Sequence, residues 1–259
     1  MLSPAAHEAD GGQTSAEPLC FADAATAQME RLVADFGRMY RERNEALQEV
    51  TRAHHEALLR LSLAAEFKDD DTGVHIVRIG YMAEALALLL GETAAFAAML
   101  RRAAPMHDVG KIGIADGVLK KAGPLAPDER VAMNRHPEIG AAILGQSRIP
   151  LFQLAASIAL SHHERWDGRG YPHGLAGEAI PLAGRIVAVV DFVDALTMSR
   201  CYRPAYDDDL ALEMLADASG KAFDPRVVDT FIGHAGQMLA LRDRLNAARP
   251  SFAELVATV

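Results

Sequence analysis

A long stretch without helix-breaking residues is the feature that most constrains the fold of this chain. From Phe21 to about Lys68 the sequence contains no proline, and Gly37 is its single glycine. Apolar residues recur there at intervals of three and four, which is the spacing of one helical face. They include Met29, Leu32, Phe36 and Met39. This pattern predicts one long amphipathic helix, with charged residues on its other faces.

Two interpretations of this helix remain open. Intervals of three and four residues are typical of a coiled coil, so the helix would form a parallel dimer stalk. Arg43 stands where the next apolar residue of the stripe is due, which makes the repeat imperfect. The other interpretation is a helix laid along a globular domain. Both place the N-terminal helix at residues 19–60, and the first predicts a homodimer through it.

The rest of the chain has the pattern of shorter helices separated by loops rich in glycine and proline. Helices are expected at residues 74–90, 92–106, 151–163, 182–198, 207–219 and 225–245, with a further one opening at His136-Pro137. No segment shows the alternation of apolar and polar residues that indicates a strand. Aromatic residues make up only 6% of the chain, while Ala and Leu are abundant, which also favours helices. The predicted fold class is all-α.

Composition and charge exclude several classes of protein. Half of the residues are apolar and 24% are charged, which is typical of a soluble globular protein. A net charge of −9 argues against the basic face that DNA or a membrane surface would require. Residues 1–18 are expected to be a disordered tail. Because no signal peptide and no membrane-spanning run is visible, we expect a cytoplasmic location.

Histidine and aspartate residues occur side by side in the predicted helices. His107 is followed by Asp108, and His162 is followed by His163. Neutral imidazole and carboxylate groups together suit iron, manganese or zinc. A carboxylate can bridge two cations whereas an imidazole cannot, so Asp108 is the natural bridge of a two-metal site.

Three further aspartates suit the same chemistry. Asp191 interrupts an apolar helical stretch, where a charge is costly unless it is paired or metal-bound. Asp194 follows three residues later on the same helical face. Asp71 precedes His75 by four residues, so both share a face if the helix begins early enough. The alternative for Asp71 is an acidic helix cap, and both readings stay open.

Basic residues near these positions indicate an anionic substrate. Lys111 follows His107 by four residues, and a lysine beside a cation cluster makes sense if an anion such as a phosphate lies between them. Arg200 and Arg203 lie just beyond the helix that carries Asp191 and could reach the same anion. The alternative is that both arginines are solvated surface residues.

The motifs around these residues resemble the HD-GYP domain, a subgroup of the HD metal-dependent phosphohydrolases. The similar segments are Asp71–Arg78, His107–Lys121, His162–Leu175 with its Gly170-Tyr171-Pro172, and Ile180–Thr197. Two prolines usual in the family are replaced by Ala115 and Ala122. The resemblance covers roughly residues 60–235, and motifs this numerous at this spacing are specific.

The resemblance implies an HD-type helical bundle at residues 61–259 that hydrolyses cyclic di-GMP, a bacterial second messenger, by metal-activated hydroxide. The product would be linear pGpG, with further hydrolysis to GMP left open. Two divalent metal ions, iron or manganese, would be bound by His75, His107, Asp108, His136, His162, His163 and Asp191. Catalysis would use His107, Asp108 and Lys111. Contacts to the substrate would come from Lys111, Tyr171, Asp194, Arg200 and Arg203.

One departure from the family concerns a third metal. Many members carry glutamate at the position of Asp71, and in some that glutamate helps to hold a third ion. Aspartate is one methylene shorter, so its carboxylate reaches about 1.5 Å less far, whereas metal–ligand distances tolerate an error of roughly 0.2 Å. We therefore expect a binuclear site, with Asp71 at most a weak ligand of a third ion and pGpG as the main product.

Two alternative functions remain open. A catalytically silent domain would bind cyclic di-GMP and signal through the N-terminal helix to a protein partner. Another HD phosphohydrolase would act on a different nucleotide, although the Gly-Tyr-Pro loop, Arg200 and Arg203 argue against it. Whether the nucleotide is consumed in the presence of Mn²⁺ or Fe²⁺ separates the first alternative from an enzyme.

Overall fold

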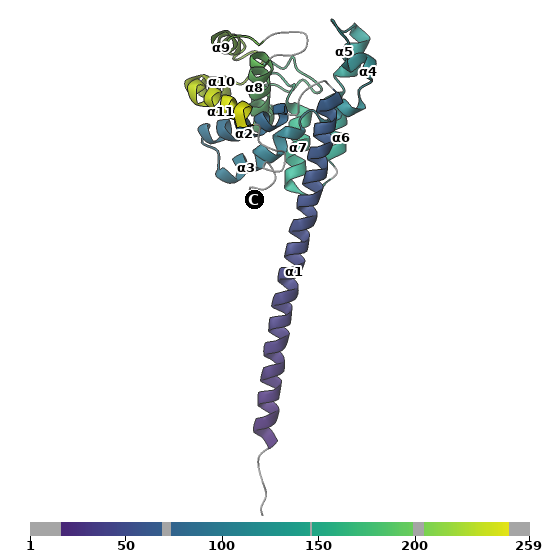
Figure 1. The fold of residues 1–259 in the computed structure, drawn as a ribbon, viewed down its shortest axis with the longest axis vertical. Helices are drawn as coiled ribbons and strands as arrows, with labels where there is room; N and C mark the ends of the chain where they lie inside the picture. The colour runs from purple at the N-terminus through teal and green to yellow at the C-terminus, as the bar shows by residue number, and fades with distance from the viewer. Residues whose placement is uncertain (1–16, 69–73, 146, 199–204, 249–259) are drawn as a thin grey trace, which may run out of the picture. The chain divides into compact units, whose positions relative to one another are not determined.

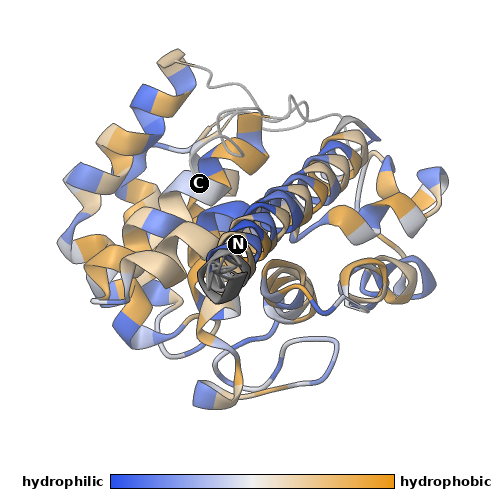
Figure 2. Cartoon of the chain, turned by 90° about the horizontal axis from the view of Figure 1, so that it is seen from below, coloured by the Kyte–Doolittle hydropathy of each residue, from blue (hydrophilic) through white to orange (hydrophobic). Residues whose placement is uncertain are grey.

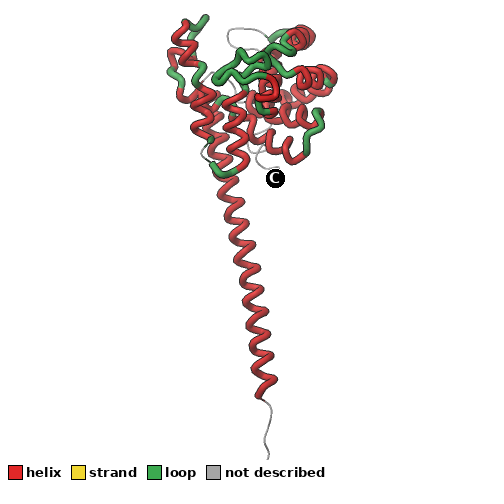
Figure 3. Tube along the Cα trace, turned by 180° about the vertical axis from the view of Figure 1, so that it is seen from behind, coloured by secondary structure: helices red, strands yellow, loops and turns green. Residues whose placement is uncertain are grey.

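The computed structural model describes residues 17–68, 74–145, 147–198 and 205–248, and most of these residues are helical (Figures 1 and 3). Within these ranges there is no strand, and the two isolated β-bridges join Asp167 to Ala176 and Ser219 to Phe223. The predicted all-α class is therefore confirmed. None of the described helices combines the length and the apolar character needed to cross a bilayer. The tail expected at residues 1–18 lies almost entirely outside the described ranges.

The long N-terminal helix is α1, which runs without a break from Glu17 to Lys68. The chain divides into two compact units, of which the first ends at Ala53 and the second begins at His54. The domain boundary therefore comes earlier than the one expected after residue 60, and both positions lie inside α1. Leu59 and Ala65 explain why, because both are buried and so make the last turns of α1 part of the second unit.

The second unit consists of short helices joined by loops. After α1 they are α2 (Val74–Leu89), α3 (Ala94–Ala103), η1 (Ala104–Met106), η2 (Val109–Gly113), α4 (Asp116–Leu119), α5 (Pro127–Met133), α6 (His136–Leu144), α7 (Pro150–Ser161), η3 (Gly177–Ala179), α8 (Leu182–Thr197), α9 (Asp208–Asp217), α10 (Pro225–Gly233) and α11 (Ala235–Ala248). The helix expected at residues 225–245 is thus two helices. They are separated at His234, which leaves the helical region with φ −121° and ψ 23°.

The core of this unit lies between α2, α3, α7 and α8. Helix α2 packs against α3, α8 and α11, and α7 packs against α3, α6 and α8. Leu86, Leu100, Ile158 and Val190 are fully buried there, and helices of the chain carry both hydrophobic and hydrophilic residues (Figure 2). Because α2 begins beside His75, α7 ends beside His162 and α8 contains Asp191, the packing that forms the core also gathers the candidate ligands.

Two glycines allow backbone segments near these ligands to approach closely. A Cβ atom at Gly110 would lie 1.9 Å from the carbonyl oxygen of His136, so no side chain fits where η2 meets the start of α6. A Cβ atom at Gly170 would lie 2.3 Å from the backbone nitrogen of Arg165. These approaches fix the segments that follow Asp108 and His163 against their neighbours.

Candidate metal centre

Asp108 lies at the centre of a buried cluster of histidines. Its Oδ1 is 3.2 Å from Nε2 of His136 and 3.4 Å from Nε2 of His162, and its Oδ2 is 3.4 Å from Nε2 of His107. Burial raises the pKa of Asp108, but Lys111 and His107 hold that pKa well below its usual value. The carboxylate is therefore anionic, and its two oxygens face different histidines, as a bridging ligand requires.

The candidate ligand atoms divide into two groups, one of which contains Asp108. One group contains Asp108, His136, His162 and His163, and the other contains His75, His107 and Asp191. The ligand atoms of each group lie within 4.8 Å of one another. The structure thus brings together all the residues that the resemblance implied as ligands of two ions. They come from α2, the turn between η1 and η2, α6, the end of α7 and α8.

Hydrogen bonds on the outer nitrogen orient three of the buried histidines. Each Nδ1 lies beside a backbone carbonyl: His107 with Ala104 at 3.0 Å, His136 with Met133 at 2.8 Å, and His162 with Ala159 at 2.9 Å. Because the carbonyl requires Nδ1 to carry the proton, Nε2 is left with a lone pair that faces the cluster. This is the orientation found in histidines that bind metals.

The inward-facing atoms have no partner among the described residues. Nε2 of His107, His136 and His162 and Oδ1 of Asp108 are buried without a hydrogen bond, whereas buried polar atoms in proteins normally have one. Lone pairs that face each other at 3.2–3.4 Å repel unless a cation or a proton lies between them. Imidazole and carboxylate donors suit first-row divalent metals, so this donor set fits a pair of such ions.

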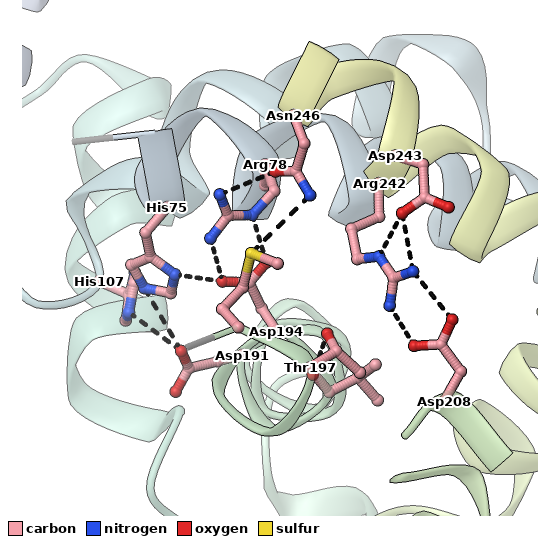
Figure 4. Close-up of polar contacts among 12 residues, drawn as sticks. His75, Arg78, His107, Asp191, Asp194, Thr197, Asp208, Arg242, Asp243 and Asn246 are labelled. Atoms are coloured by element: carbon pink, nitrogen blue, oxygen red, sulfur yellow. Dashed lines mark hydrogen bonds and ion pairs between the residues drawn. The ribbon is translucent and has the colours of Figure 1, made fainter. Parts of the chain in front are cut away.

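Asp194 orients His75 and is not open to a ligand (Figure 4). Its side chain is buried, and it accepts hydrogen bonds from Nδ1 of His75 at 2.7 Å and from Nε and Nη2 of Arg78 at 2.6 and 2.8 Å. Burial raises the pKa of Asp194, but these hydrogen bonds hold that pKa well below its usual value. Both carboxylate oxygens of Asp194 therefore already accept hydrogen bonds from His75 and Arg78. This placement corrects the substrate contact expected of Asp194, which instead positions His75.

His75 stands in a strongly negative environment. Its Nε2 lies 3.5 Å from Oδ1 of Asp191, and that oxygen lies 3.9 Å from Nε2 of His107. Burial lowers the pKa of His75, but Glu66, Asp194 and Asp191 together raise it to about 10. The same negative charges that favour a proton on His75 also favour a metal cation in its place.

Of the remaining predicted site residues, the structure describes Lys111 and Tyr171. Nζ of Lys111 lies 2.8 Å from Oδ2 of Asp108, so Lys111 borders the cluster. The ring of Tyr171 stacks on His163 with centroids 4.8 Å apart, and burial raises the pKa of Tyr171, which keeps the phenol neutral. Asp71, Arg200 and Arg203 lie outside the described residues.

Sequence reasoning did not single out two buried glutamates at this site. Glu164 accepts hydrogen bonds from the backbone N–H groups of His173 at 2.8 Å and Leu175 at 3.0 Å, and so holds the loop that carries Tyr171. Its position next to His163 was a usable signal. Glu66, in the last turn of α1, is the other. The sequence signal for its burial was that Glu66 follows the apolar Leu59 by seven residues, which places both on one helical face.

Comparisons with known proteins identify relatives of this fold. A match to the HD domain family covers residues 46–227. The chain is 45% identical over 193 residues to the cyclic di-GMP phosphodiesterase response regulator RpfG of Xanthomonas campestris, an alignment that covers 74% of this chain and 51% of that protein. It is 40% identical over 190 residues to 3′3′-cGAMP-specific phosphodiesterase 2 of Vibrio cholerae, with 73% and 36% covered.

A solved structure shares the fold at lower identity. It is the crystal structure of a cyclic GMP-AMP specific phosphodiesterase of V. cholerae, with a TM-score of 0.53 and 19% identity, covering 79% of this chain and 53% of that one. At this identity the similarity concerns the fold alone. The chain spans about half the length, or less, of the curated relatives named above.

Proposed function

This chain belongs to the HD domain family, and from that premise we propose that it is a phosphodiesterase that hydrolyses cyclic di-GMP to linear pGpG with two divalent ions, iron or manganese. The observation that carries the proposal is the convergence of unpartnered Nε2 atoms on the Asp108 carboxylate. Relatives named as cyclic di-GMP phosphodiesterases support the choice of substrate. The short side chain of Asp71 supports pGpG as the main product.

The site residues have separate parts in this function. The bound ions supply the Lewis acidity that activates water and stabilises charge on the phosphate. Asp108 faces both ligand groups and fixes their separation. Lys111 places a positive charge beside Asp108, where a phosphate oxygen can accept a hydrogen bond from its ammonium group. Tyr171 borders the centre by stacking on His163. Arg200 and Arg203 would hold the phosphate from the segment that follows α8.

Turnover of cyclic di-GMP tests this proposal directly. Protein purified without oxygen and supplied with Mn²⁺ or Fe²⁺ is expected to consume cyclic di-GMP, with pGpG accumulating on chromatography. Elemental analysis of the same sample is expected to give two metals per chain, and a chelator should abolish turnover. Protein that carries both ions and binds cyclic di-GMP but leaves it intact would contradict the proposal and favour the silent sensor.

Cyclic GMP-AMP is the second candidate substrate. The observation that favours it is the 40% identity to a 3′3′-cGAMP-specific phosphodiesterase, which is close to the 45% identity to a cyclic di-GMP enzyme. The ratio of kcat/KM for the two nucleotides, measured on one preparation, decides between them. We propose that cyclic di-GMP has the higher value.

We also propose that α1 pairs with a second copy of itself. Within residues 23–53 the large apolar side chains of Met29, Leu32, Phe36 and Met39 are between 46% and 67% exposed. Val50 resumes the stripe two heptads after Phe36 and is also exposed. An exposed stripe at intervals of three and four residues favours a parallel coiled coil of two identical helices.

Charged substitutions on the stripe are expected to separate the dimer. A Leu32→Lys/Phe36→Lys double variant places four lysines in the seam of the pair, so the protein should become a monomer by light scattering after size exclusion. Ala34→Lys/Gln48→Lys adds the same charge at exposed positions off the stripe and should leave the dimer intact. Wild-type protein that is monomeric at micromolar concentration would contradict this pairing.

A further inference from the structure

The imidazole of His163 is held in a different way from those of the other candidate histidine ligands. Three of the others face a backbone carbonyl through Nδ1, and Nδ1 of His75 faces Asp194. Within the described part of the chain, the His163 side chain forms no such hydrogen bond. The groups that its ring contacts are aromatic, so ring contacts set the direction of this ligand.

The ring of Tyr171 stacks on this imidazole. Their centroids are 4.8 Å apart and their planes differ by 24°, and Tyr171 also lies edge-on to His136, with centroids 6.4 Å apart. Rotation about the bond between Cβ and the ring is broad for histidine, so an imidazole without a hydrogen bond can turn its nitrogens away from the ligand group. A stacked aromatic ring is a stabilising neighbour, and it restricts this rotation of His163.

The backbone of the loop places Tyr171 beside His163. The backbone N–H of Tyr171 donates a hydrogen bond to the carbonyl oxygen of His163 at 3.2 Å. One residue earlier, a Cβ atom at Gly170 would lie 2.5 Å from Cα of Glu164, so the loop returns onto its own start at a distance that only glycine permits. The same two residues are therefore joined twice, by a hydrogen bond between their main chains and by the stacking of their rings.

Contacts on both sides of Tyr171 hold the loop in this position. After Tyr171, the backbone N–H groups of His173 and Leu175 donate hydrogen bonds to the buried carboxylate of Glu164, at 2.8 and 3.0 Å. Before it, the backbone N–H groups of residues 166 and 167 donate hydrogen bonds to the turn between α9 and α10, at 3.1 and 2.8 Å. The loop is thus fixed by hydrogen bonds that do not involve the Tyr171 side chain, so the ring can be changed while the loop stays in place.

We propose that Tyr171 is a positioning residue of the metal centre, whose stacked ring fixes the imidazole of His163 and so strengthens binding of the ion at the ligand group that contains Asp108. The inference rests on the metal-dependent function proposed above. It gives Tyr171 a part in metal loading before any nucleotide binds, in addition to its place at the border of the centre. The flat ring carries this part, and the hydroxyl does not, because the contact with His163 is between the rings.

Titration of metal-free protein with Mn²⁺ tests this role without any measurement of turnover. Wild-type protein is expected to bind two ions, followed by electron paramagnetic resonance of free Mn²⁺. Tyr171→Leu keeps an apolar side chain and removes the flat ring, so it should bind one ion normally and the other roughly 2- to 10-fold more weakly, the range that a stacked aromatic pair contributes. Tyr171→Phe keeps the ring and removes the hydroxyl, and it should retain both affinities.

A double substitution shows whether the ring acts through His163. In a His163→Ala background the ligand that Tyr171 positions is gone, so adding Tyr171→Leu should not weaken Mn²⁺ binding further. Tyr81→Leu is the matched control, because Tyr81 is a half-buried tyrosine of α2 whose ring lies under Arg101 at 5.5 Å. Its loss should leave both Mn²⁺ affinities unchanged.

Several results would overturn the inference. One is a Tyr171→Leu protein that binds both ions as tightly as the wild type, and another is a Tyr171→Phe protein as weak as Tyr171→Leu. An equal effect of Tyr171→Leu with and without His163 would show that the ring acts elsewhere. Tyr171→Met supplies a second variant without a ring if the Leu variant loses its helical circular dichroism. Wild-type protein that binds no Mn²⁺ would overturn the proposed function instead.

Discussion

Replacing Asp108 with asparagine is expected to lower the turnover of cyclic di-GMP by roughly 10³-fold or more. The Asp108 oxygens face His136 and His162 on one side and His107 on the other. An amide has the same shape but offers one neutral oxygen, so it cannot bridge two cations. Initial rates at saturating Mn²⁺, with the metal content of each sample, measure the loss.

Asp128→Asn is the control for this substitution. Asp128 lies exposed in the first turn of α5, away from both ligand groups, so its amide variant should keep the wild-type rate and two metals. An Asp108→Asn protein that kept more than a tenth of the wild-type rate with both metals bound would contradict the bridging role of Asp108.

Replacing Asp194 with alanine is expected to lower the free energy of unfolding by about 3–5 kcal/mol, the usual cost of breaking a buried ion pair. The substitution leaves Arg78 and His75 buried without the carboxylate that both contact. Denaturation of metal-free protein by urea, followed by circular dichroism, measures the loss. Asp208→Ala is the matched control, since Asp208 pairs with Arg242 in the same region but is 41% exposed (Figure 4). Its loss should be about 1 kcal/mol or less.

The same carboxylate predicts how stability depends on pH. The pKa of Asp194 is lower in the folded protein than in the unfolded chain, whose value is about 3.9. Its contribution is therefore complete above about pH 4 and is lost as the pH falls below that value. Wild-type protein should lose its stability advantage over Asp194→Asn between about pH 4 and pH 2. An advantage that stayed constant over this interval, or an Asp194→Ala loss no larger than that of Asp208→Ala, would contradict the assignment.

Local patterns were sufficient to predict the main helices. The absence of breakers from Phe21 to Lys68 predicted α1, and the spans expected at 74–90 and 182–198 agree with α2 and α8 to within a residue at each end. The separation of α10 from α11 was missed because no proline marks it. The short helices α4 and α5 were missed for a different reason, since they lie within a stretch whose glycines and prolines indicated a loop.

The candidate site was predictable where its residues lie close together in the sequence. His107 and Asp108 are adjacent, as are His162 and His163, and motifs of this kind identified the converging ligands. Contacts across the fold could not be found in this way. His75 and Asp194 are 119 positions apart, so nothing in the sequence indicated that the Asp194 oxygens were used by the fold. Glu66 belongs to no motif, and only its burial distinguishes it from the exposed glutamates of α1.

At Gly110 the backbone lies so close to the carbonyl oxygen of His136 that no side chain fits between the two segments. This spacing is set by backbone atoms, so replacing one core side chain with another does not alter it. Substitutions in the surrounding core are therefore expected to leave unchanged the distance between the turn that contains Asp108 and the helix that begins at His136. Substitutions in the apolar interior that leave these backbone segments in place would keep the same arrangement of candidate ligands.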